Sequence, residues 1–338
     1  LLAQHYAEAD ATVARQALEL AAVIGLEVDP GTWTQGCAIE GIVAPGGLVD
    51  LLVAQGLALP SRAGWSFVHG MLRESLEDLA DTAGRRALHH RCCAAILRAR
   101  GQGHAEALAR HLIAAGDLAA AMEPLLEATY QMQLAGQYDR AERVLGEHAA
   151  LADRCGVAAE DVRRLRGRMQ AVWLTWMRGG DGSLALARAR CREVEGAARR
   201  GGHDDVLGEA LRWHGLVGRF ERRFAESQAA LVQAAAAFAR AGDVGGQART
   251  ALAAAVTLRA VGALDAAEAE LAEAERLARS CGLTLLLPRI AGNRAELALQ
   301  REDWEAAALR FGEAIAAAEA SGDRKALALT LGGAGGPG

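Results

Sequence analysis

The chain has 338 residues, of which 51% are hydrophobic and 23% charged, and its formal net charge at pH 7 is −5. That much apolar material can fill the cores of about two domains, which excludes a disordered chain. Ala and Leu supply most of the apolar residues, whereas aromatic residues make up only 4%, so the composition predicts an all-α fold.

The cysteines and the hydropathy pattern indicate a reducing compartment. Six cysteines are scattered without a disulfide framework, and the sequence contains neither a signal peptide nor a long uninterrupted apolar run. We therefore expect a cytoplasmic protein with no membrane partner. The chain begins at Leu1 rather than Met and ends in LGGAGGPG at residues 331–338, so we expect a piece of a longer protein with a truncated or flexible tail.

The first hundred residues predict two helices, a small β-hairpin and a further helix. Val13–Ile24 has the apolar pattern of a helix, and Gly46–Gly56 predicts a second one. Trp65–Val68 alternates apolar and polar residues next to Gly64, which is typical of one arm of a hairpin. This outline predicts a winged-helix-like domain over residues 1–100.

Four metal-ligand residue types fall close together in this domain, but their spacing argues against a metal site. His89 and Cys93 share a helix face, whereas His90 and Cys92 point elsewhere, and no second cluster follows at zinc-site spacing. We predict instead that Leu88, Cys92 and Ile96 face the domain core, and that the chain holds no metal.

No catalytic constellation is present in the sequence. It contains no nucleophile elbow, no H-E-x-x-H helix and no kinase loop set. Lys325 is the only lysine, and its neighbours do not form a phosphate-binding Gly-x-x-x-x-Gly-Lys loop. We expect no enzyme activity within these residues, whereas ATPase, kinase or cyclase activity stays open for a full-length protein.

Residues 101–330 are predicted to form a repeat array, in which the interval between units is 40 residues from Leu184 onward. Bulky residues and glycines both recur at this interval, as Leu184, Phe224, Leu264 and Trp304 and as Gly202, Gly242, Gly282 and Gly322. A unit this short closes its apolar face only against its neighbours. The period therefore predicts an α-solenoid whose function resides on a surface.

Each unit is predicted to be a pair of packed helices. Small residues coincide when three units are superposed, as Gly215, Ala255 and Ala295, as Ser227, Ala267 and Ala307, and as Ala234, Ala274 and Ala314. In the unit that ends at Gly242 we place helices near Gly208–Glu221 and Ala225–Ala241. We expect left-handed glycines after the second helices, and Asp243 and Asp323 as caps of the next ones.

The earlier units are less regular. Arg178–Gly182, with the sequence RGGDG, predicts a longer turn, and Pro124 predicts a kink or the first turn of a helix. The spacing of Gly136, Tyr138 and Ala141 resembles the tetratricopeptide repeat, and the resemblance covers roughly Ala105–Thr330. The units depart from that family in having 40 rather than about 34 residues, so HEAT-type repeats remain the alternative.

A second resemblance covers about 120 residues. Its segments occur in order as Ala21–Gly25, Leu57, Trp65–His69, Leu72–Glu74, Arg85–His89 and Leu108–Asp117. They resemble the region after the nucleotide-binding module in STAND-type (AAA/NACHT-like) signalling ATPases, such as large LuxR-type regulators and multidomain bacterial kinases or cyclases. The resemblance implies ATP or ADP in a nucleotide-binding domain outside this chain, no cofactor within it, and contact of His69 with the nucleotide phosphates.

Arginines mark the candidate partner-binding surface. Residues 154–223 contain 15 arginines against 9 acidic residues, which predicts a local basic patch on an acidic chain. Superposition on the tetratricopeptide pattern puts five arginines on the first helices, lining the inner groove: Arg212, Arg219, Arg249, Arg259 and Arg289. Their guanidinium groups suit carboxylates or phosphates of a partner, or they only solubilise an Ala-rich solenoid.

Three functions are consistent with this sequence. The favoured one is the sensor arm of a signalling ATPase, which binds a protein, a peptide or a small inducer in the solenoid groove and relays binding to its own nucleotide-binding domain. The second is a stand-alone scaffold for protein–protein interaction. The third is a transcriptional regulator that contacts DNA through Arg85 and Arg86, although the negative net charge and the lack of interleaved aromatic residues disfavour a nucleic acid partner.

Overall fold

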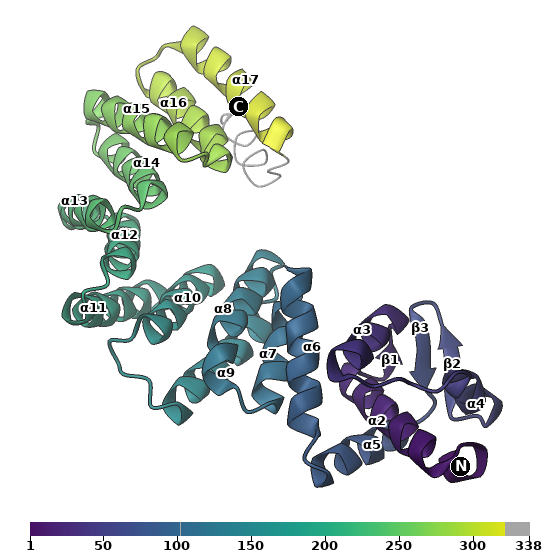
Figure 1. The fold of residues 1–338 in the computed structure, drawn as a ribbon. Coiled ribbons are helices and arrows are strands. Elements are labelled where there is room, and N and C mark those ends of the chain that lie inside the picture. The colour runs from purple at the N-terminus through teal and green to yellow at the C-terminus, as the bar shows by residue number, and fades with distance from the viewer. Residues whose placement is uncertain (102, 322–338) are drawn as a thin grey trace. The chain divides into compact units, whose positions relative to one another are not determined.

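The computed structural model describes residues 1–101 and 103–321 (Figure 1). The chain forms two compact units, which divide between Val157 and Ala158. The regular secondary structure of the described residues is helical apart from one three-stranded sheet, which confirms the all-α prediction. Gly322, Asp323, Lys325 and the predicted tail at 331–338 lie outside the described residues.

Unit 1 begins with a mixed module of five helices and three short strands. Its elements are α1 (Leu2–His5), α2 (Glu8–Ile24), β1 (Glu27–Val28), α3 (Pro30–Glu40), α4 (Leu48–Ala54), β2 (Ala58–Ser61), β3 (Gly64–Phe67) and α5 (Gly70–Thr82). Strand β3 pairs antiparallel with both β1 and β2, so the predicted hairpin is confirmed. The two helices predicted at Val13–Ile24 and Gly46–Gly56 are α2 and α4.

Three aromatic side chains hold the module together. The ring of Trp65 lies edge-on to Trp33, at 5.8 Å, and to Phe67, at 5.0 Å between centroids. The indole N–H of Trp33 donates to the carbonyl oxygen of Ala17 at 2.7 Å, which fixes α3 against α2. Edge-to-face packing stabilises the buried rings, although the indole nitrogen of Trp65 has no hydrogen-bond partner.

Helix α3 was not predicted, although its start carries a recognisable signal. The Asp29 carboxylate accepts a hydrogen bond from the backbone N–H of Thr32 at 2.8 Å, and Pro30 occupies the first helical turn. An N-cap Asp followed by Pro is typical of a helix beginning. The segment itself, PGTWTQGCAIE, lacks the regular apolar stripe by which the other helices were found.

The rest of unit 1 consists of α6 (Arg86–Arg100), α7 (Ala105–Ala114), α8 (Leu118–Leu134) and α9 (Tyr138–Arg154). Helix α6 contacts α2 and α3 of the module and also α7. Cys92 and Ile96 are buried as predicted, but the prediction for Leu88 was wrong because that side chain is 51% exposed. Pro124 lies in the interior of α8.

Unit 2 is a stack of helix pairs. Its helices are α10 (Val162–Arg178), α11 (Ser183–Gly201), α12 (Asp204–Phe220), α13 (Phe224–Ala241), α14 (Val244–Ala260), α15 (Leu264–Ser280), α16 (Leu287–Gln300) and α17 (Trp304–Ser321), with a short 3₁₀ helix, η1 (Thr284–Leu286), before α16. The two helices predicted in the unit ending at Gly242 are α12 and α13. The predicted RGGDG turn joins α10 to α11.

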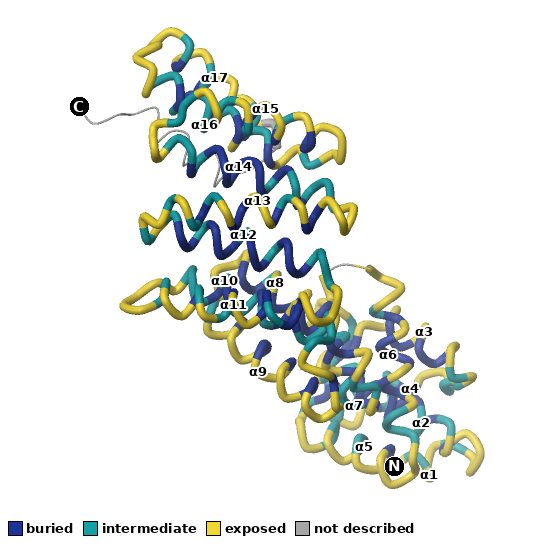
Figure 2. Tube along the Cα trace, turned by 90° about the vertical axis from the view of Figure 1, so that its left-hand side faces the viewer, coloured by how far each residue is buried: buried dark blue, intermediate teal, exposed yellow. Residues whose placement is uncertain are grey.

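The first helix of each pair forms the inner layer of unit 2. Helices α10, α12, α14 and α16 contact one another in series, and each also packs on its own second helix. Figure 2 shows α12 and α14 as largely buried tubes beside the more exposed α11, α13 and α15. Side chains of α12 and α14 therefore reach the surface at few positions.

Small residues make the predicted close crossings. All nine residues of the three superposed small sets are buried. The ring of Phe238, 1% exposed, fits between Gly208 of α12 and Gly246 of α14. A methyl group added to Gly208 would lie 2.8 Å from this ring, and one added to Gly246 would be closer still.

Glycines end the second helices as predicted. Gly202, Gly242 and Gly282 have φ of 71°, 70° and 71°, which is the left-handed region that permits a short turn into the next helix. After Gly242, the side chain of Asp243 accepts a hydrogen bond from the backbone N–H of Gly246 at 2.7 Å. The predicted cap of α14 is thus confirmed.

The Phe238 contact predicts that Gly246→Ala lowers the free energy of unfolding by about 1–3 kcal/mol, because the added methyl group forces the buried ring or the backbone to move. Gly312→Ala in α17 is the matched control, since no atom lies within 4 Å of the added carbon. The control is expected to be neutral or stabilising by up to about 1 kcal/mol. Urea denaturation followed by circular dichroism measures both, and equal stability of the two variants would contradict this packing.

Candidate functional site

The five arginines proposed for partner binding lie on first helices of unit 2. Arg212 and Arg219 belong to α12, Arg249 and Arg259 to α14, and Arg289 to α16, where it is exposed. Their surroundings differ, and these differences decide which of them have guanidinium groups that are open to a ligand.

Arg212 is held within its own helix. Its Nε and Nη2 donate to the two carboxylate oxygens of Glu209 at 3.0 and 2.5 Å, and its guanidinium lies 5.3 Å from the ring centroid of Trp213. The indole N–H of Trp213 also donates to Glu209, at 2.9 Å. Burial alone raises the pKa of Glu209, but the Arg212 charge and hydrogen bond outweigh burial and leave that pKa below its usual value. Arg212 therefore has a structural partner already.

Arg249 and Arg259 also face carboxylates. A guanidinium nitrogen of Arg249 lies 3.6 Å from a carboxylate oxygen of Asp243, and Arg259 forms an ion pair with Glu296 of α16. The Arg259 side chain is only 20% exposed, and its Nε is buried without a hydrogen-bond partner. Arg259 thus links two first helices while keeping one donor unused.

Arg219 differs from these three in having no acidic partner. Within the described part of the chain, no carboxylate lies at ion-pairing distance from it, and its Nε is buried without a hydrogen-bond partner. Burial lowers the pKa of Arg219, and the neighbouring positive charge of Arg259 lowers it further. The structure thus places two guanidinium groups, Arg219 and Arg259, close enough to repel each other on the inner layer.

Aromatic residues that the sequence analysis did not single out surround these arginines. The guanidinium of Arg219 lies 4.4 Å from the ring centroid of Phe220, which is 51% exposed. Trp176 of α10 packs edge-on against Phe220 at 4.4 Å and against Trp213 at 5.9 Å. A signal was present, because aromatic residues are scarce in this chain and yet cluster in the α10–α12 sequence.

A buried histidine fixes α12 to both neighbouring second helices. Nδ1 of His214 lies 2.7 Å from a carboxylate oxygen of Glu195 in α11, and Nε2 lies 3.3 Å from one of Glu226 in α13. The hydrogen bond to Glu195 is the largest cause that raises the pKa of His214, against the opposing effect of burial. The histidine therefore favours its charged form between the two carboxylates.

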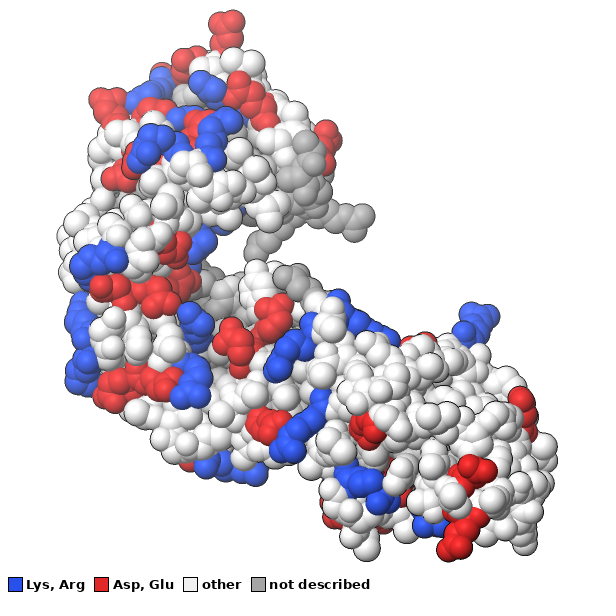
Figure 3. All heavy atoms as spheres, viewed as in Figure 1, with Lys and Arg blue, Asp and Glu red and all other residues white. Residues whose placement is uncertain are grey.

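Many arginines of the predicted basic patch at residues 154–223 pair with acidic side chains, most of which belong to the same segment. Its arginines lie within 4 Å of acidic side chains in pairs such as Arg166–Asp205, Arg188–Glu221, Arg192–Glu226 and Arg200–Glu160. Figure 3 shows arginines interspersed with Asp and Glu over this part of unit 2. Surface pairs of this kind contribute little to stability, and they intersperse negative charges among the positive ones, although the segment keeps its excess of arginines.

His69, the predicted nucleotide-sensing residue, is exposed at the residue before α5. Its backbone is extended, and its side chain makes no capping hydrogen bond. The imidazole is therefore open to solvent at the beginning of a helix, where backbone N–H groups favour anions.

Helix α6 carries two buried histidines with different partners. Nδ1 of His89 lies 2.7 Å from a carboxylate oxygen of Glu40 in α3, close to Glu19 of α2, which also accepts two hydrogen bonds from Arg85. Nδ1 of His90 lies 2.9 Å from Nδ1 of His111 in α7. Burial is the main cause that lowers the pKa of both His90 and His111 to about 4, so this pair is neutral at pH 7.

No group of three or more His, Cys, Asp or Glu side chains arranged to hold a metal ion occurs among residues 1–101 and 103–321. Burial raises the pKa of Cys92 and of Cys93 to about 12, so both remain thiols rather than the thiolates that bind zinc.

Arg85 and Arg86, the predicted DNA contacts, form a cluster with the nearby Arg91, and all three arginines lie close to acidic residues. Arg85 donates to Glu19 at 2.8 and 2.9 Å, and Arg91 donates to Asp117 at 3.0 and 3.1 Å. Arg86 lies 3.8 Å from Glu77 and 4.0 Å from Asp81. This arrangement argues against phosphate contacts by the cluster.

Each of the described helices is too short or too polar to cross a lipid bilayer.

The bridge made by His214 predicts a pH-dependent stability. Because the pKa of the folded state is raised above the unfolded value of 6.5, the stabilisation is fully present below about pH 6.5 and is lost as the pH rises through the folded pKa. His214→Gln is expected to cost about 1–3 kcal/mol at acidic pH and less at alkaline pH. Urea denaturation between about pH 5.5 and 9 measures this, and a difference that grows with pH would contradict it.

The comparisons with known proteins agree with a helical repeat fold. No family model and no curated protein matches the sequence. Among solved structures, BtubC (BKLC) from P. vanneervenii is similar over 65% of this chain and 87% of its own, with 16% identity and a TM-score of 0.51. A Signal Transduction ATPase with Numerous Domains (STAND) protein with a tetratricopeptide repeat sensor, from Pyrococcus horikoshii, is similar over 94% of this chain at 10% identity, also with a TM-score of 0.51. This chain spans about half, 52%, of that STAND protein.

Proposed function

We propose that this chain is the sensor arm of a STAND-type signalling ATPase. In this proposal the first helices of unit 2 bind an acidic segment of a protein or peptide, and the N-terminal module passes this event to a nucleotide switch. The similarity in fold to a STAND protein with a repeat sensor supports the proposal, as does the order of the sequence segments from Ala21 to Asp117.

The observation that carries the binding function is the unpaired Arg219 beside Arg259. A partly buried guanidinium next to a second one costs free energy, because each charge loses water and repels the other. Proteins keep such unfavourable arrangements of charge mainly at functional sites. A carboxylate placed between the two guanidinium groups would satisfy donors that the fold leaves unused.

The surroundings favour an acidic peptide over other anions. Exposed Phe220 and partly exposed Trp176 offer an apolar platform next to the guanidinium groups, which suits a carboxylate side chain flanked by an apolar one. The ion-paired arginines around them leave no extended cationic track for a nucleic acid backbone. Ligand specificity would then come from one buried anion contact with aromatic neighbours.

The N-terminal module supports the relay function. Its order of helix, strand, two helices and two strands, from α2 to β3, is that of a winged helix, and we propose this fold for residues 1–100, with the solenoid arm over 101–330. His69 is open to a phosphate of ATP or ADP that another domain of the full-length protein would hold. The relay requires that the ligand bind one state of the arm more tightly than the other.

A stand-alone scaffold is the second candidate function, because the same surface would serve it equally well. The two differ in nucleotide control. For a sensor arm, ATP and ADP change the affinity of the full-length protein for an acidic peptide, whereas for a scaffold the affinity is the same in both nucleotides.

Arg219→Gln tests the binding site. We expect this variant to bind a pool of Asp- and Glu-containing peptides at least about tenfold more weakly than the wild type, since a charge-assisted hydrogen bond contributes about 1.5–3 kcal/mol. Without ligand, the variant should be as stable as the wild type or more stable, because the repulsion from Arg259 is removed.

The control is Arg276→Gln on the outer helix α15, where the arginine is 64% exposed and paired with Glu273. Fluorescence anisotropy with labelled peptides and with their Asn- and Gln-substituted counterparts measures the affinities. If acidic and neutral peptides bind alike, or if both variants lose the same affinity, Arg219 is not the anion site.

A further inference from the structure

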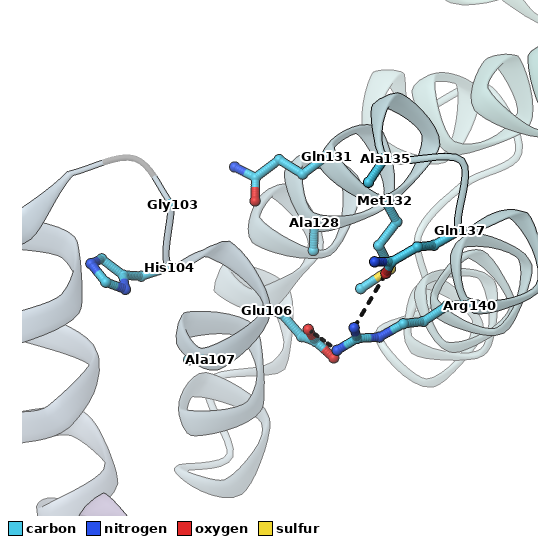
Figure 4. A pocket seen from close by; sticks show the side chains of 10 residues that line it. All are labelled: Gly103, His104, Glu106, Ala107, Ala128, Gln131, Met132, Ala135, Gln137 and Arg140. Carbon is cyan, nitrogen blue, oxygen red and sulfur yellow. Dashed lines mark hydrogen bonds and ion pairs between the residues drawn. The ribbon is translucent and has the colours of Figure 1, made fainter. Parts of the chain in front are cut away.

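Two hollows lie side by side in unit 1, between α7, α8 and α9. Their volumes are about 340 and 570 Å³, and the ion pair between Glu106 of α7 and Arg140 of α9, at 2.5 Å, separates them. Figure 4 shows the smaller hollow, in which these two side chains point toward one another and Arg140 also donates to the amide oxygen of Gln137, at 3.3 Å. The ion pair therefore forms a shared wall.

The larger hollow carries opposite charges on an apolar base. Arg110 of α7 and Glu147 of α9 both line it, and its apolar lining includes Leu125 and Val144, which are 3% and 6% exposed. Within the described residues neither Arg110 nor Glu147 has an ion-pair partner. A ligand can therefore bind both groups without breaking a contact of the fold.

The charges restrict the chemistry of such a ligand. The two arginines and two glutamates of the lining sum to zero, so neither a polyanion nor a polyamine is favoured: Glu147 repels a phosphate and Arg110 repels a second ammonium group. A molecule with one carboxylate and one ammonium group can pair with both Arg110 and Glu147. An apolar side chain of the same molecule would then lie on Leu125 and Val144. The volume lies within the range of about 300–1,000 Å³ that is usual for small-molecule sites.

We propose that the larger hollow binds a small zwitterion of the amino-acid type with an apolar side chain. Its carboxylate contacts Arg110, its ammonium group contacts Glu147, and its side chain lies on Leu125 and Val144. This site is independent of the acidic-peptide site around Arg219, because the two share no residue and belong to different units.

Calorimetric titration of the whole chain tests the proposal with matched probes. L-leucine and the dipeptide Leu–Leu carry both charges, whereas 4-methylpentanoate lacks the ammonium group and 3-methylbutylamine lacks the carboxylate. We expect at least one zwitterion to bind and both single-charge analogues to bind about tenfold more weakly or worse, since each loses a charged contact. Binding of an analogue as tightly as the zwitterion would overturn the proposal, as would the failure of both zwitterions to bind.

Variants locate the site. Arg110→Gln and Glu147→Gln should each weaken zwitterion binding by about tenfold, with Arg110→Lys retaining part of the affinity. Arg143→Gln, an exposed arginine of α9 that does not line either hollow, is the control and should bind like the wild type. Thermal denaturation confirms that the variants fold, as their exposed positions predict. If Arg110→Gln and Glu147→Gln both bind the zwitterion as tightly as the wild type, the ligand binds elsewhere.

The outcome separates this site from the proposed peptide site. Arg219→Gln should leave zwitterion binding unchanged, and Arg110→Gln should leave acidic-peptide binding unchanged. Loss of both ligands in either variant would show that one site, not two, had been described.

Discussion

The close crossing of helices at small residues is the constraint on which unit 2 depends. Phe238 occupies the space that Gly208 and Gly246 leave free, and buried alanines at the 40-residue interval repeat the close approach along the stack. This packing puts the first helices in an inner layer with little exposed surface. Side chains there must either pair with one another, as Arg212 does with Glu209, or remain unsatisfied, as Arg219 does. The same tight packing that stabilises the helix pairs therefore makes an unpaired charge costly in free energy. For that reason the unpaired Arg219 points to a binding function.

The repeat could be predicted from sequence because its information is local. A fixed interval of small and bulky residues, ending in a glycine, determines both helices of a pair, and α12 and α13 lie where that pattern places them. Helix α3 has no such stripe, and Leu88 was misplaced because the buried face of α6 is set by α2, α3 and α7 rather than by its own pattern. The acidic partners of the arginines could not be predicted from the sequence either. Glu296 is 37 residues from Arg259, and only the stacking of α14 on α16 brings them together. The aromatic cluster could have been noticed from its composition, whereas its contacts with Arg219 could not.

Helix α6 gives the proposed relay a physical route within unit 1. Two successive histidines face opposite ways: His89 reaches Glu40 in the N-terminal module, and His90 reaches His111 in α7. Any shift of α7 that disturbs the His90–His111 contact acts on the same short segment that holds the module by buried charges. Such buried polar networks have few alternative arrangements, because each lost hydrogen bond leaves a desolvated group behind. When one helix is displaced, such a network therefore switches to a different set of hydrogen bonds instead of deforming gradually.

The zwitterion site lies at the beginning of this route. Arg110 directly precedes His111, and its positive charge is one of the causes that hold the pKa of both His90 and His111 below the usual value, although burial is the larger cause. A carboxylate bound to Arg110 would offset that charge and make the pair easier to protonate. By linkage, protonation of the pair would then strengthen carboxylate binding by the same factor. Because burial dominates, the pair stays neutral near pH 7 in either case, so the ligand would act there mainly through the position of α7. Ligand-dependent packing of α7 on α6, rather than a change of charge, is therefore the coupling that these side chains favour at neutral pH.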